Sequence, residues 1–378
     1  MNKTLNFQGF IKNVTYSAFL TEKLTQYDLE NFDINTSKSY GLIKTVNTEI
    51  AYSKWVSPKR TRSYPFARIY NTYNSAKILT VIPVIKDEGS DGDRDKIQYS
   101  TIDWMNLLNI YIVLAYYETA NKNLRKGQEN KHKLTNHKFN NDFVKEQIRE
   151  IITYRQSALH WNRSLFESKF TMIFEQALNS YDNISSQTNV KIHSRQGMDI
   201  YINKINDRFE QFKQLSLQSS LNASQREVNT FHQLEHLTDG NKATFKIQNY
   251  LGGIYYLTTD EVTYLDNKYV IQESKNSSRS PLPDLSDIQD GLFKLILFSN
   301  LDRLILNNHS ISFTTKLKLT GKNVINSLVL PDDLSNKLDS FLRCNNQIFT
   351  KKQKQTIQKL AEETKKNKNI NIEITNNH

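Results

Sequence analysis

The sequence predicts a mixed α/β protein of the α+β kind, and three observations lead to this class. Hydrophobic residues recur at helical spacing through residues 143–219. Three short runs rich in β-branched and aromatic residues follow one another between residues 244 and 275. A helical segment at 285–305 and a strand-like run at 310–319 come next. The order α-β-β-β-α-β indicates a core with a mixed sheet, beside a mostly helical N-terminal region.

Residues 1–220 make up this expected N-terminal region. The run Lys77–Ile85 (KILTVIPVI) is short, apolar and β-branched, so it predicts a buried strand. A buried helix is expected from about Ser100 to Thr119, over the longest apolar stretch. Asn121–Asp142 is polar and basic, which is typical of a surface loop or linker. Long helices should then continue to Ser219.

The core is expected over residues 221–325. Ser224 and Glu227 have the spacing of a capping box, which predicts a helix beginning there and ending near Asp239-Gly240. Three strands should follow, with a tight turn at Asp266-Asn267-Lys268 joining the last two into a hairpin. The strand-like runs are Thr244–Asn249, Gly253–Leu265 and Tyr269–Lys275. Residues 326–378 are expected to be a basic extension, with an exposed helix and a frayed tail.

Composition favours a polyanionic partner and a reducing compartment. The 50 Lys and Arg residues against 39 Asp and Glu give a formal net charge of +11, and such a surplus suits phosphates. Basic proteins that bind no nucleic acid also exist, so charge alone does not decide. Cys344 is the single cysteine, which excludes an intramolecular disulfide framework. With no apolar run of bilayer length, we expect a cytoplasmic protein with no membrane segment.

The segment Thr259–Lys275 carries the chemistry. Glu273 and Lys275 share one face of a strand because side chains alternate along it. The hairpin should return Asp260 to their side. Two converging carboxylates make a hard-oxygen site for Mg²⁺. A neighbouring lysine can orient a water or steady a phosphate charge, as metal-assisted phosphodiester hydrolysis requires.

The tripeptide Glu-x-Lys is weak evidence without its context. The chain contains four copies, at Glu129–Lys131, Glu167–Lys169, Glu273–Lys275 and Glu363–Lys365. Only the third lies on an expected buried strand, with an acid opening the strand before it and an amphipathic helix after it. The alternative is a surface hairpin with an ordinary ion pair. Asp266 has metal-binding chemistry too, but a turn tip favours Asp for local reasons.

This hairpin resembles the PD-(D/E)xK nuclease superfamily, the fold of many type II restriction endonucleases. The resemblance covers about Leu221–Leu319 and implies a restriction-endonuclease-like core. It departs from the family pattern at Thr259, where a proline usually precedes the first acid. It implies that Asp260, Glu273 and the Ser274 carbonyl bind Mg²⁺ and that Lys275 serves the attacking water. Duplex DNA would be cut to a 5′-phosphate and a 3′-hydroxyl.

Family members often add a glutamate from the preceding helix, and Glu235 and Glu227 are the candidates, Glu227 being the poorer because of its capping role. Gln289 lies where some members have a glutamine in the following helix. A type II restriction enzyme would read a specific sequence, as a homodimer if the site is palindromic. A repair, recombination or mobile-element nuclease could use the same core. A DNA-binding protein without catalysis is the alternative from another class.

Two N-terminal segments are further candidates. Lys54–Arg68 interleaves basic and aromatic residues, which suits contacts with a DNA backbone and names Lys59, Arg60 and Arg62 as ligands. It could equally be a strand-loop with core aromatics. Lys86–Asp95 is acidic, with two glycines. It could be a solvated loop, a cation site or a loop entering a DNA groove, where Arg94 would contact a base.

Overall fold

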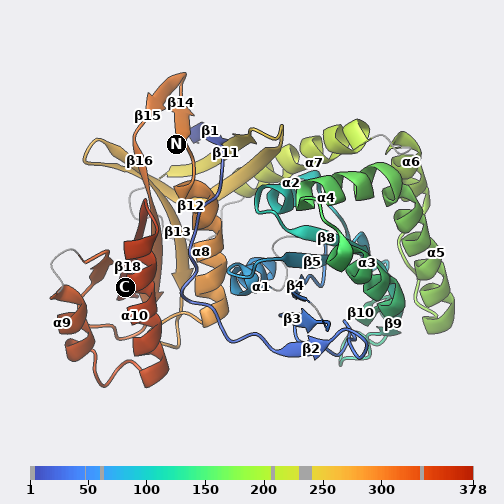
Figure 1. Ribbon diagram of the computed structural model, residues 1–378, viewed down its shortest axis with the longest axis horizontal. Helices are drawn as coiled ribbons and strands as arrows, with labels where there is room; N and C mark the ends of the chain where they lie inside the picture. The colour runs from blue at the N-terminus through green and yellow to red at the C-terminus, as the bar shows by residue number, and fades with distance from the viewer. Residues whose placement is uncertain are drawn as a thin grey trace. The chain divides into compact units, whose positions relative to one another are not determined.

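The computed structural model describes residues 5–46, 48–59, 64–205, 209–229, 241–332 and 336–377 (Figure 1). The protein is of the mixed α/β class, as the sequence predicts. It divides into two compact units. The C-terminal unit comprises Met1–Glu22 and Ser219–His378, and the N-terminal unit comprises Lys23–Gln218. The first residues therefore join the second half of the chain, whereas we expected one region over residues 1–220.

A nine-stranded mixed sheet forms the centre of the C-terminal unit, in the order β15-β14-β1-β11-β12-β13-β16-β18-β17. The three expected strands of the core and the strand after them are confirmed as β11, β12, β13 and β16. The first three pair antiparallel, and β13 pairs parallel to β16. The strands are β1 (Leu5–Ile11), β11 (Asn241–Asn249), β12 (Ile254–Leu265), β13 (Lys268–Asn276), β14 (Arg303–Leu306), β15 (His309–Ile311), β16 (Phe313–Gly321), β17 (Leu328–Leu330) and β18 (Ile370–Asn376).

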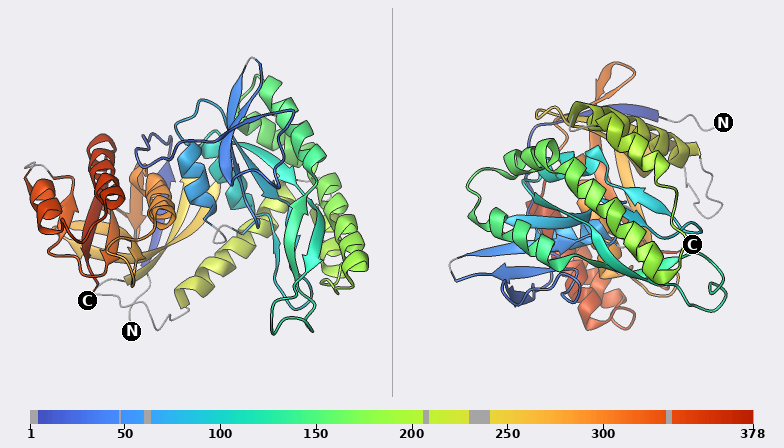
Figure 2. Two further views of the ribbon diagram at one scale, coloured as in Figure 1. Left: turned by 90° about the horizontal axis from the view of Figure 1, so that it is seen from below. Right: turned by 90° about the vertical axis from the view of Figure 1, so that its right-hand side faces the viewer.

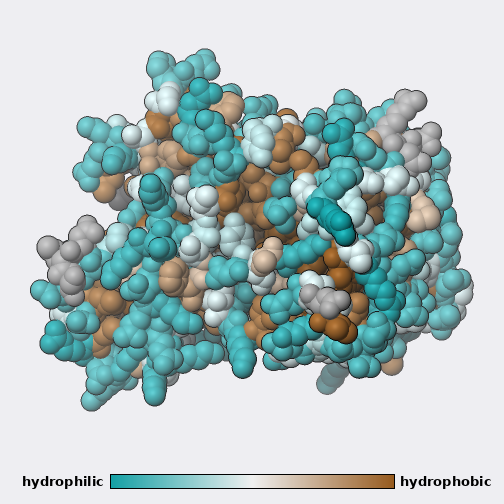
Figure 3. Space-filling view, in the orientation of Figure 1, coloured by the Kyte–Doolittle hydropathy of each residue, from teal (hydrophilic) through white to brown (hydrophobic). Residues whose placement is uncertain are grey.

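Two helices cover one face of this sheet, α8 (Leu285–Ser299) over β13 and β16, and α10 (Lys351–Lys366) over β18 (Figure 2). The expected helix at 285–305 is thus confirmed but ends earlier, because Arg303–Leu306 forms β14. Ile288, Leu292 and Leu295 of α8 are fully buried. A third helix, α9 (Lys337–Cys344), contacts β17. Hydrophilic side chains cover most of the surface over α9 and α10 (Figure 3).

The expected frayed tail is wrong. Residues 370–376 form β18, which pairs in parallel with β16 and antiparallel with β17. Ile370, Ile372 and Ile374 are buried, and this alternation of apolar residues is typical of a strand with one covered face. The residues after 326 therefore complete the sheet and do not form a separate extension.

The N-terminal unit contains a five-stranded sheet, in the order β2-β3-β4-β5-β8. Its last three strands run parallel. Helix α1 (Pro65–Thr72) connects β4 to β5, and the β6–β7 hairpin and α2 (Tyr99–Leu107) connect β5 to β8. The strands are β2 (Gln26–Asp28), β3 (Tyr40–Lys44), β4 (Glu49–Lys54), β5 (Ile78–Pro83), β6 (Ile85–Asp87), β7 (Arg94–Lys96) and β8 (Tyr111–Ala115). The buried strand expected at 77–85 is confirmed, since every residue of β5 is buried.

The expectation of a mostly helical N-terminal region is wrong, because strands make up much of it. The helices expected over residues 143–219 are confirmed. None of the described helices is both long and apolar enough to cross a bilayer. The linker expected at 121–142 is partly a hairpin of β9 (Tyr117–Lys122) and β10 (Leu134–Phe139). The helices are α3 (Asn141–Thr153), α4 (Ala158–Ser168), α5 (Phe170–Thr188), α6 (Gln196–Ile205) and α7 (Phe209–Asn229).

Two expected helices have different limits. The helix expected to reach Thr119 ends at Leu107, because Asn109 takes a left-handed conformation (φ 53°) and the residues after it form β8 and β9. Their β-branched and aromatic side chains favour strands. The capping box at Ser224 is also wrong, since this residue lies inside α7, which begins at Phe209. The helix end expected at 239–240 lies outside the described residues.

Candidate active site

The β12–β13 hairpin forms as expected and directs its functional residues toward α8. Val262 pairs with Ile271, and the two strands meet at a turn where Asp266 and Asn267 have φ of 49° and 60°. Asn and Asp tolerate these left-handed angles better than most residues, which explains Asp266 as a turn residue. Glu273 and Lys275 follow Ile271 at alternate positions of β13, so all three face the helix.

An irregularity in the sheet aims Asp260. Ala243 of β11 pairs with Thr259, but Asn241 pairs with Val262, so two steps along β11 correspond to three along β12. The extra residue makes a β-bulge, a feature that re-aims a side chain and is common beside active sites. The Asp260 carboxylate accepts a hydrogen bond from the backbone N–H of Ser274 on β13 (Oδ2–N 2.8 Å). The bulge thus brings Asp260 to the strand that bears Glu273.

Glu273 is completely buried, with 0% of its surface exposed. Its Oε2 accepts from Nζ of Lys294 on α8 at 2.8 Å, while its Oε1 is buried without any hydrogen bond. Burial raises the pKa of Glu273 to about 7, because it outweighs the attraction of the Lys294 ammonium, and the charge of Asp260 raises it further. Near neutral pH this carboxyl therefore passes between its protonated and ionised forms.

Lys294 is a site residue that motif reasoning missed. Burial alone would lower the pKa of Lys294, but the carboxylates of Glu273 and Asp260 outweigh it and raise that pKa above its usual value. Lys294 therefore stays protonated. One signal in the sequence could have found it, because Lys294 is the single charged residue in the apolar run Gly291–Phe298. A charge on the buried side of a helix needs a partner.

Lys275 lies against the same helix, where its Nζ contacts Asp290 Oδ2 at 3.1 Å. Gly291 makes this approach possible. A Cβ at that position would lie 2.7 Å from Leu317 Cδ1, closer than real contacts, and 3.3 Å from Lys275 Cε, so both side chains would have to shift. The structure thus brings together three sequence-predicted residues, Asp260, Glu273 and Lys275, and adds Asp290 and Lys294 from α8.

The expected accessory residues are placed elsewhere or lie outside the described chain. Gln289 is buried, and its Nε2 donates to the Leu20 carbonyl at 2.8 Å, so it fastens the N-terminal segment to α8. Glu235 and the side chain of Glu227 lie outside the described residues. Of Ser274, the structure shows the N–H bound to Asp260, and metal binding by its carbonyl stays a prediction.

The DNA-binding candidates of the N-terminal unit are partly engaged inside the protein. Lys59 is exposed and lies 4.0 Å from Asp95, and Arg94 donates to the Ser194 carbonyl at 2.8 Å. Arg60 and Arg62 lie outside the described residues. Of the aromatic residues between Lys54 and Arg68, Trp55 and Phe66 belong to the core.

The acidic loop at Lys86–Asp95 is a hairpin, β6–β7, whose acids have partners within the protein. Asp87 is buried and accepts from the backbone N–H of Gly89, while Asp91 accepts from the backbone N–H of His132. Asp95 accepts from the Ser57 hydroxyl at 2.9 Å. Over the described chain no group of three or more His, Cys, Asp and Glu residues could hold a metal ion. The loop's acids therefore support the fold of this unit.

Asp260 and Glu273 provide a smaller donor set, which suits magnesium. Mg²⁺ is often held by only one or two carboxylates, with water and substrate phosphate completing its shell. The buried Oε1 of Glu273, which has no hydrogen bond, is an oxygen in need of a partner. Comparison with known proteins adds nothing further: no family model, no curated protein and no solved structure matches the chain.

Proposed function

We propose that this protein is a magnesium-dependent endonuclease that hydrolyses phosphodiester bonds of double-stranded DNA. The observation that carries the proposal is the meeting of three acids and two lysines on β12, β13 and α8. Glu273, completely buried and with one oxygen unsatisfied, is its centre. The strand order and the parallel β13–β16 pair agree with the PD-(D/E)xK core that the motif resembles. The net charge of +11 suits a polyanionic substrate.

In this proposal each residue of the cluster has one task. Asp260 and Glu273 would hold Mg²⁺, assisted by the Ser274 carbonyl, and a bound Mg²⁺ would supply Lewis acidity toward a water and the phosphate. Lys275 orients the attacking water or contacts the scissile phosphate through its ammonium group. Asp290 positions Lys275 through the 3.1 Å ion pair. Lys294 keeps the Glu273 carboxyl in place through their 2.8 Å contact.

The direct test is incubation of the whole protein with plasmid DNA and Mg²⁺, followed by mapping of the ends. We expect nicking or linearisation that EDTA abolishes and that Asp260→Ala, Glu273→Ala and Lys275→Ala each reduce by a factor of at least about 100, as loss of a metal ligand or a transition-state contact does. Glu129→Ala is the matched control, because it removes the acid of another Glu-x-Lys at an exposed position. Normal cutting by Glu273→Ala would contradict the proposal.

A DNA-binding protein without catalysis is the second candidate, and one observation favours it. Lys294 already neutralises Glu273, so the cluster could be a buried ion pair with a structural role. Measuring DNA binding in EDTA separates the two functions. Retained binding with no nicking at any Mg²⁺ or Mn²⁺ concentration would favour the non-catalytic protein.

We further propose that the enzyme is of the type II restriction class and reads a specific sequence. Discrete plasmid fragments would support this, and a homodimer in solution would accompany cutting at a palindrome. A preference for branched or broken DNA would instead identify a repair, recombination or mobile-element nuclease with the same core.

A further inference from the structure

A pocket of about 510 Å³ opens in the N-terminal unit, away from the nuclease residues in sequence. Three sides of the pocket are formed by residues at or just after the carboxyl ends of the parallel strands β4, β5 and β8. Lys54 ends β4, Lys86 lies on β6 just after β5, and Tyr117 comes two residues after β8. The fourth wall is β10. The crevice outside the carboxyl ends of parallel strands is where open α/β sheets bind their ligands, and this volume suits a small molecule.

The pocket wall carries an excess of positive charge, from Lys54, Lys86 and Lys133 against Glu88 alone. Lys86 and Glu88 form an ion pair at 2.9 Å, so the other two lysines supply the surplus. Lys133 Nζ makes no hydrogen bond or ion pair within the described chain. An anionic ligand would therefore find two ammonium groups that no carboxylate contacts directly within the described chain, although Asp33 lies near enough to Lys54 to raise its pKa.

Lys54 is held in place without losing its charge. Its Nζ donates to the carbonyls of Ile34 (2.5 Å) and Ser37 (2.8 Å), which are neutral acceptors. Burial, followed by the charge of Arg68, lowers the pKa of Lys54 to about 8, so the ammonium form still prevails at pH 7. A fixed, partly desolvated cation binds an anion more strongly than a mobile surface lysine does.

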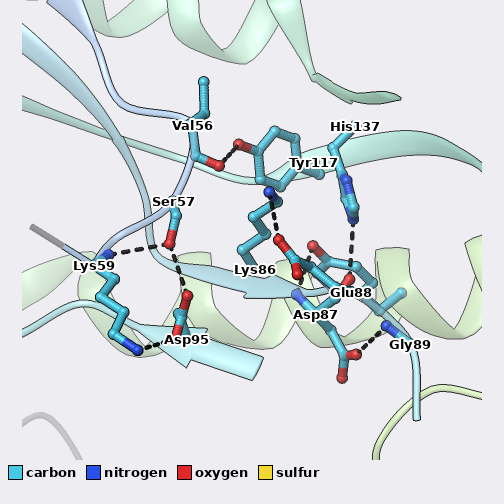
Figure 4. A network of polar contacts seen from close by, with 11 residues as sticks. Val56, Ser57, Lys59, Lys86, Asp87, Glu88, Gly89, Asp95, Tyr117 and His137 are labelled. Atoms are coloured by element: carbon cyan, nitrogen blue, oxygen red, sulfur yellow. Dashed lines mark hydrogen bonds and ion pairs between the residues drawn. The ribbon is translucent and has the colours of Figure 1, made fainter. Parts of the chain in front are cut away.

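His137 adds a hydrogen-bond acceptor to this cationic wall. Its Nε2 lies 3.0 Å from the Asp87 carbonyl (Figure 4). Because a carbonyl only accepts, Nε2 must carry the proton. Burial lowers the pKa of His137 to about 4, so the ring is neutral and its Nδ1 keeps a lone pair. The pocket therefore offers both cations and an acceptor for an N–H or O–H group.

Buried contacts fix this wall before any ligand arrives. Asp87 is 3% exposed, and its carboxylate accepts from the Gly89 N–H (2.8 Å) and contacts His193 Nδ1 (2.9 Å). The Tyr117 hydroxyl donates to the Val56 carbonyl at 2.8 Å (Figure 4). A site whose side chains are already ordered loses little entropy on binding.

We propose that this pocket binds a nucleotide, with the phosphate on Lys54 and Lys133 and a base or sugar donor on His137. A bare phosphate would leave most of the 510 Å³ empty, and a neutral ligand would leave the lysines unused. The nucleotide could be free, or it could belong to a DNA strand, and the chemistry is the same in both cases. The proposal does not depend on catalysis at Glu273.

The test is calorimetric titration of the whole protein, in EDTA, with the four deoxynucleoside monophosphates, their nucleosides and a short single-stranded oligonucleotide. We expect at least one phosphorylated probe to bind and its nucleoside to bind at least about tenfold more weakly, since a charge-assisted contact is lost. Lys133→Ala should weaken binding by about tenfold. Lys131→Ala is the matched control, because it removes the same charge from an exposed neighbour that does not line the pocket.

The outcomes separate the sources and can overturn the site. Mononucleotide binding that depends on Lys133 identifies a free nucleotide as the ligand. Binding of the oligonucleotide alone, with the same dependence, identifies a nucleotide within DNA. His137→Phe should weaken either ligand while leaving the fold unchanged by circular dichroism. The proposal is overturned by absence of binding at millimolar concentrations, or by equal effects of Lys133→Ala and Lys131→Ala.

Discussion

Replacing Lys294 by methionine isolates the electrostatics of the candidate site. The substitution keeps the aliphatic stem and removes the ammonium group that contacts Glu273 at 2.8 Å. Glu273, with 0% exposure, loses the cation that contacts it and keeps only the charge of Lys275 nearby. A buried carboxylate that loses its cation is strongly destabilised as an anion, so Glu273 should respond by holding its proton to higher pH. The loss of stability should therefore depend on pH.

The magnitude follows from the pKa of Glu273, which burial raises from 4.5 to about 7 in the intact protein. At pH 6 the carboxyl is largely protonated in both proteins, and the variant loses one hydrogen bond, worth about 1 kcal/mol. Between pH 7 and pH 8 the intact protein ionises while the variant does not. This difference adds about 1.4 kcal/mol per pH unit, so the destabilisation should reach about 2–3 kcal/mol at pH 8.

The assay is urea unfolding at pH 6 and pH 8 without metal. It is monitored through hydrogen exchange of the β13 amides, so that the measured stability is that of the C-terminal unit. Lys316→Met is the matched control, because Lys316 contacts Glu373 at 2.9 Å on the same sheet but Glu373 is 24% exposed. This partly exposed pair should contribute less than about 1 kcal/mol. Equal destabilisation of Lys294→Met at the two pH values would refute the reasoning.

Three further outcomes are expected. The C-terminal unit of the intact protein should lose stability as pH rises from about 4.5 through 7. Folding raises the pKa of Glu273, so this carboxyl stabilises the fold only while it is protonated. A urea midpoint that rises over this range would contradict the prediction. Gly291→Ala should destabilise the C-terminal unit by about 1–3 kcal/mol through its clash with Leu317. Gly197→Ala, where a Cβ would lie 3.9 Å from Arg94, should be neutral or stabilising when urea unfolding of the N-terminal unit is followed. Glu363→Gln should cost about 1.5–3 kcal/mol and speed hydrogen exchange at Phe19 and Leu20, whose N–H groups bind the Glu363 carboxylate; unchanged exchange would count against this role.

Local pattern predicted the elements that carry the site, and long-range pairing decided the rest. The hairpin was readable because its turn residues, Asp266 and Asn267, and its alternating strands act within a few positions of one another. The role of Leu5–Ile11 was not readable. It pairs in parallel with β11, some 240 residues later, and no local period indicates such a partner. Ile370–Asn376 has an alternating pattern that its polar neighbours obscured.

The residues of the candidate site also divide into those that lie close together in the sequence and those that only the fold brings together. Asp260, Glu273 and Lys275 were found because all three belong to one hairpin. Lys294 and Asp290 become partners only when α8 packs on β13, a contact that spacing along the chain does not specify. The Glu-x-Lys at Glu363 shows why the tripeptide alone would mislead. That glutamate is buried, and its carboxylate accepts hydrogen bonds from Tyr16, Phe19 and Leu20.

The cost of burying Glu273 is itself an argument for the proposed function. A buried ion pair contributes little net stability, because desolvation of two charges offsets their attraction, and apolar residues of similar volume would serve the sheet as well. Ile271 and Leu317, the neighbours of Glu273 on the same face, show that this part of the core accepts apolar side chains. The unsatisfied Oε1 adds a further penalty. A cation bound between Glu273 and Asp260 would remove both costs, so Mg²⁺ should stabilise the C-terminal unit and the gain should vanish in Glu273→Gln. Absence of any Mg²⁺-dependent shift in the urea midpoint of the intact protein would leave the structural role of the ion pair as the better explanation.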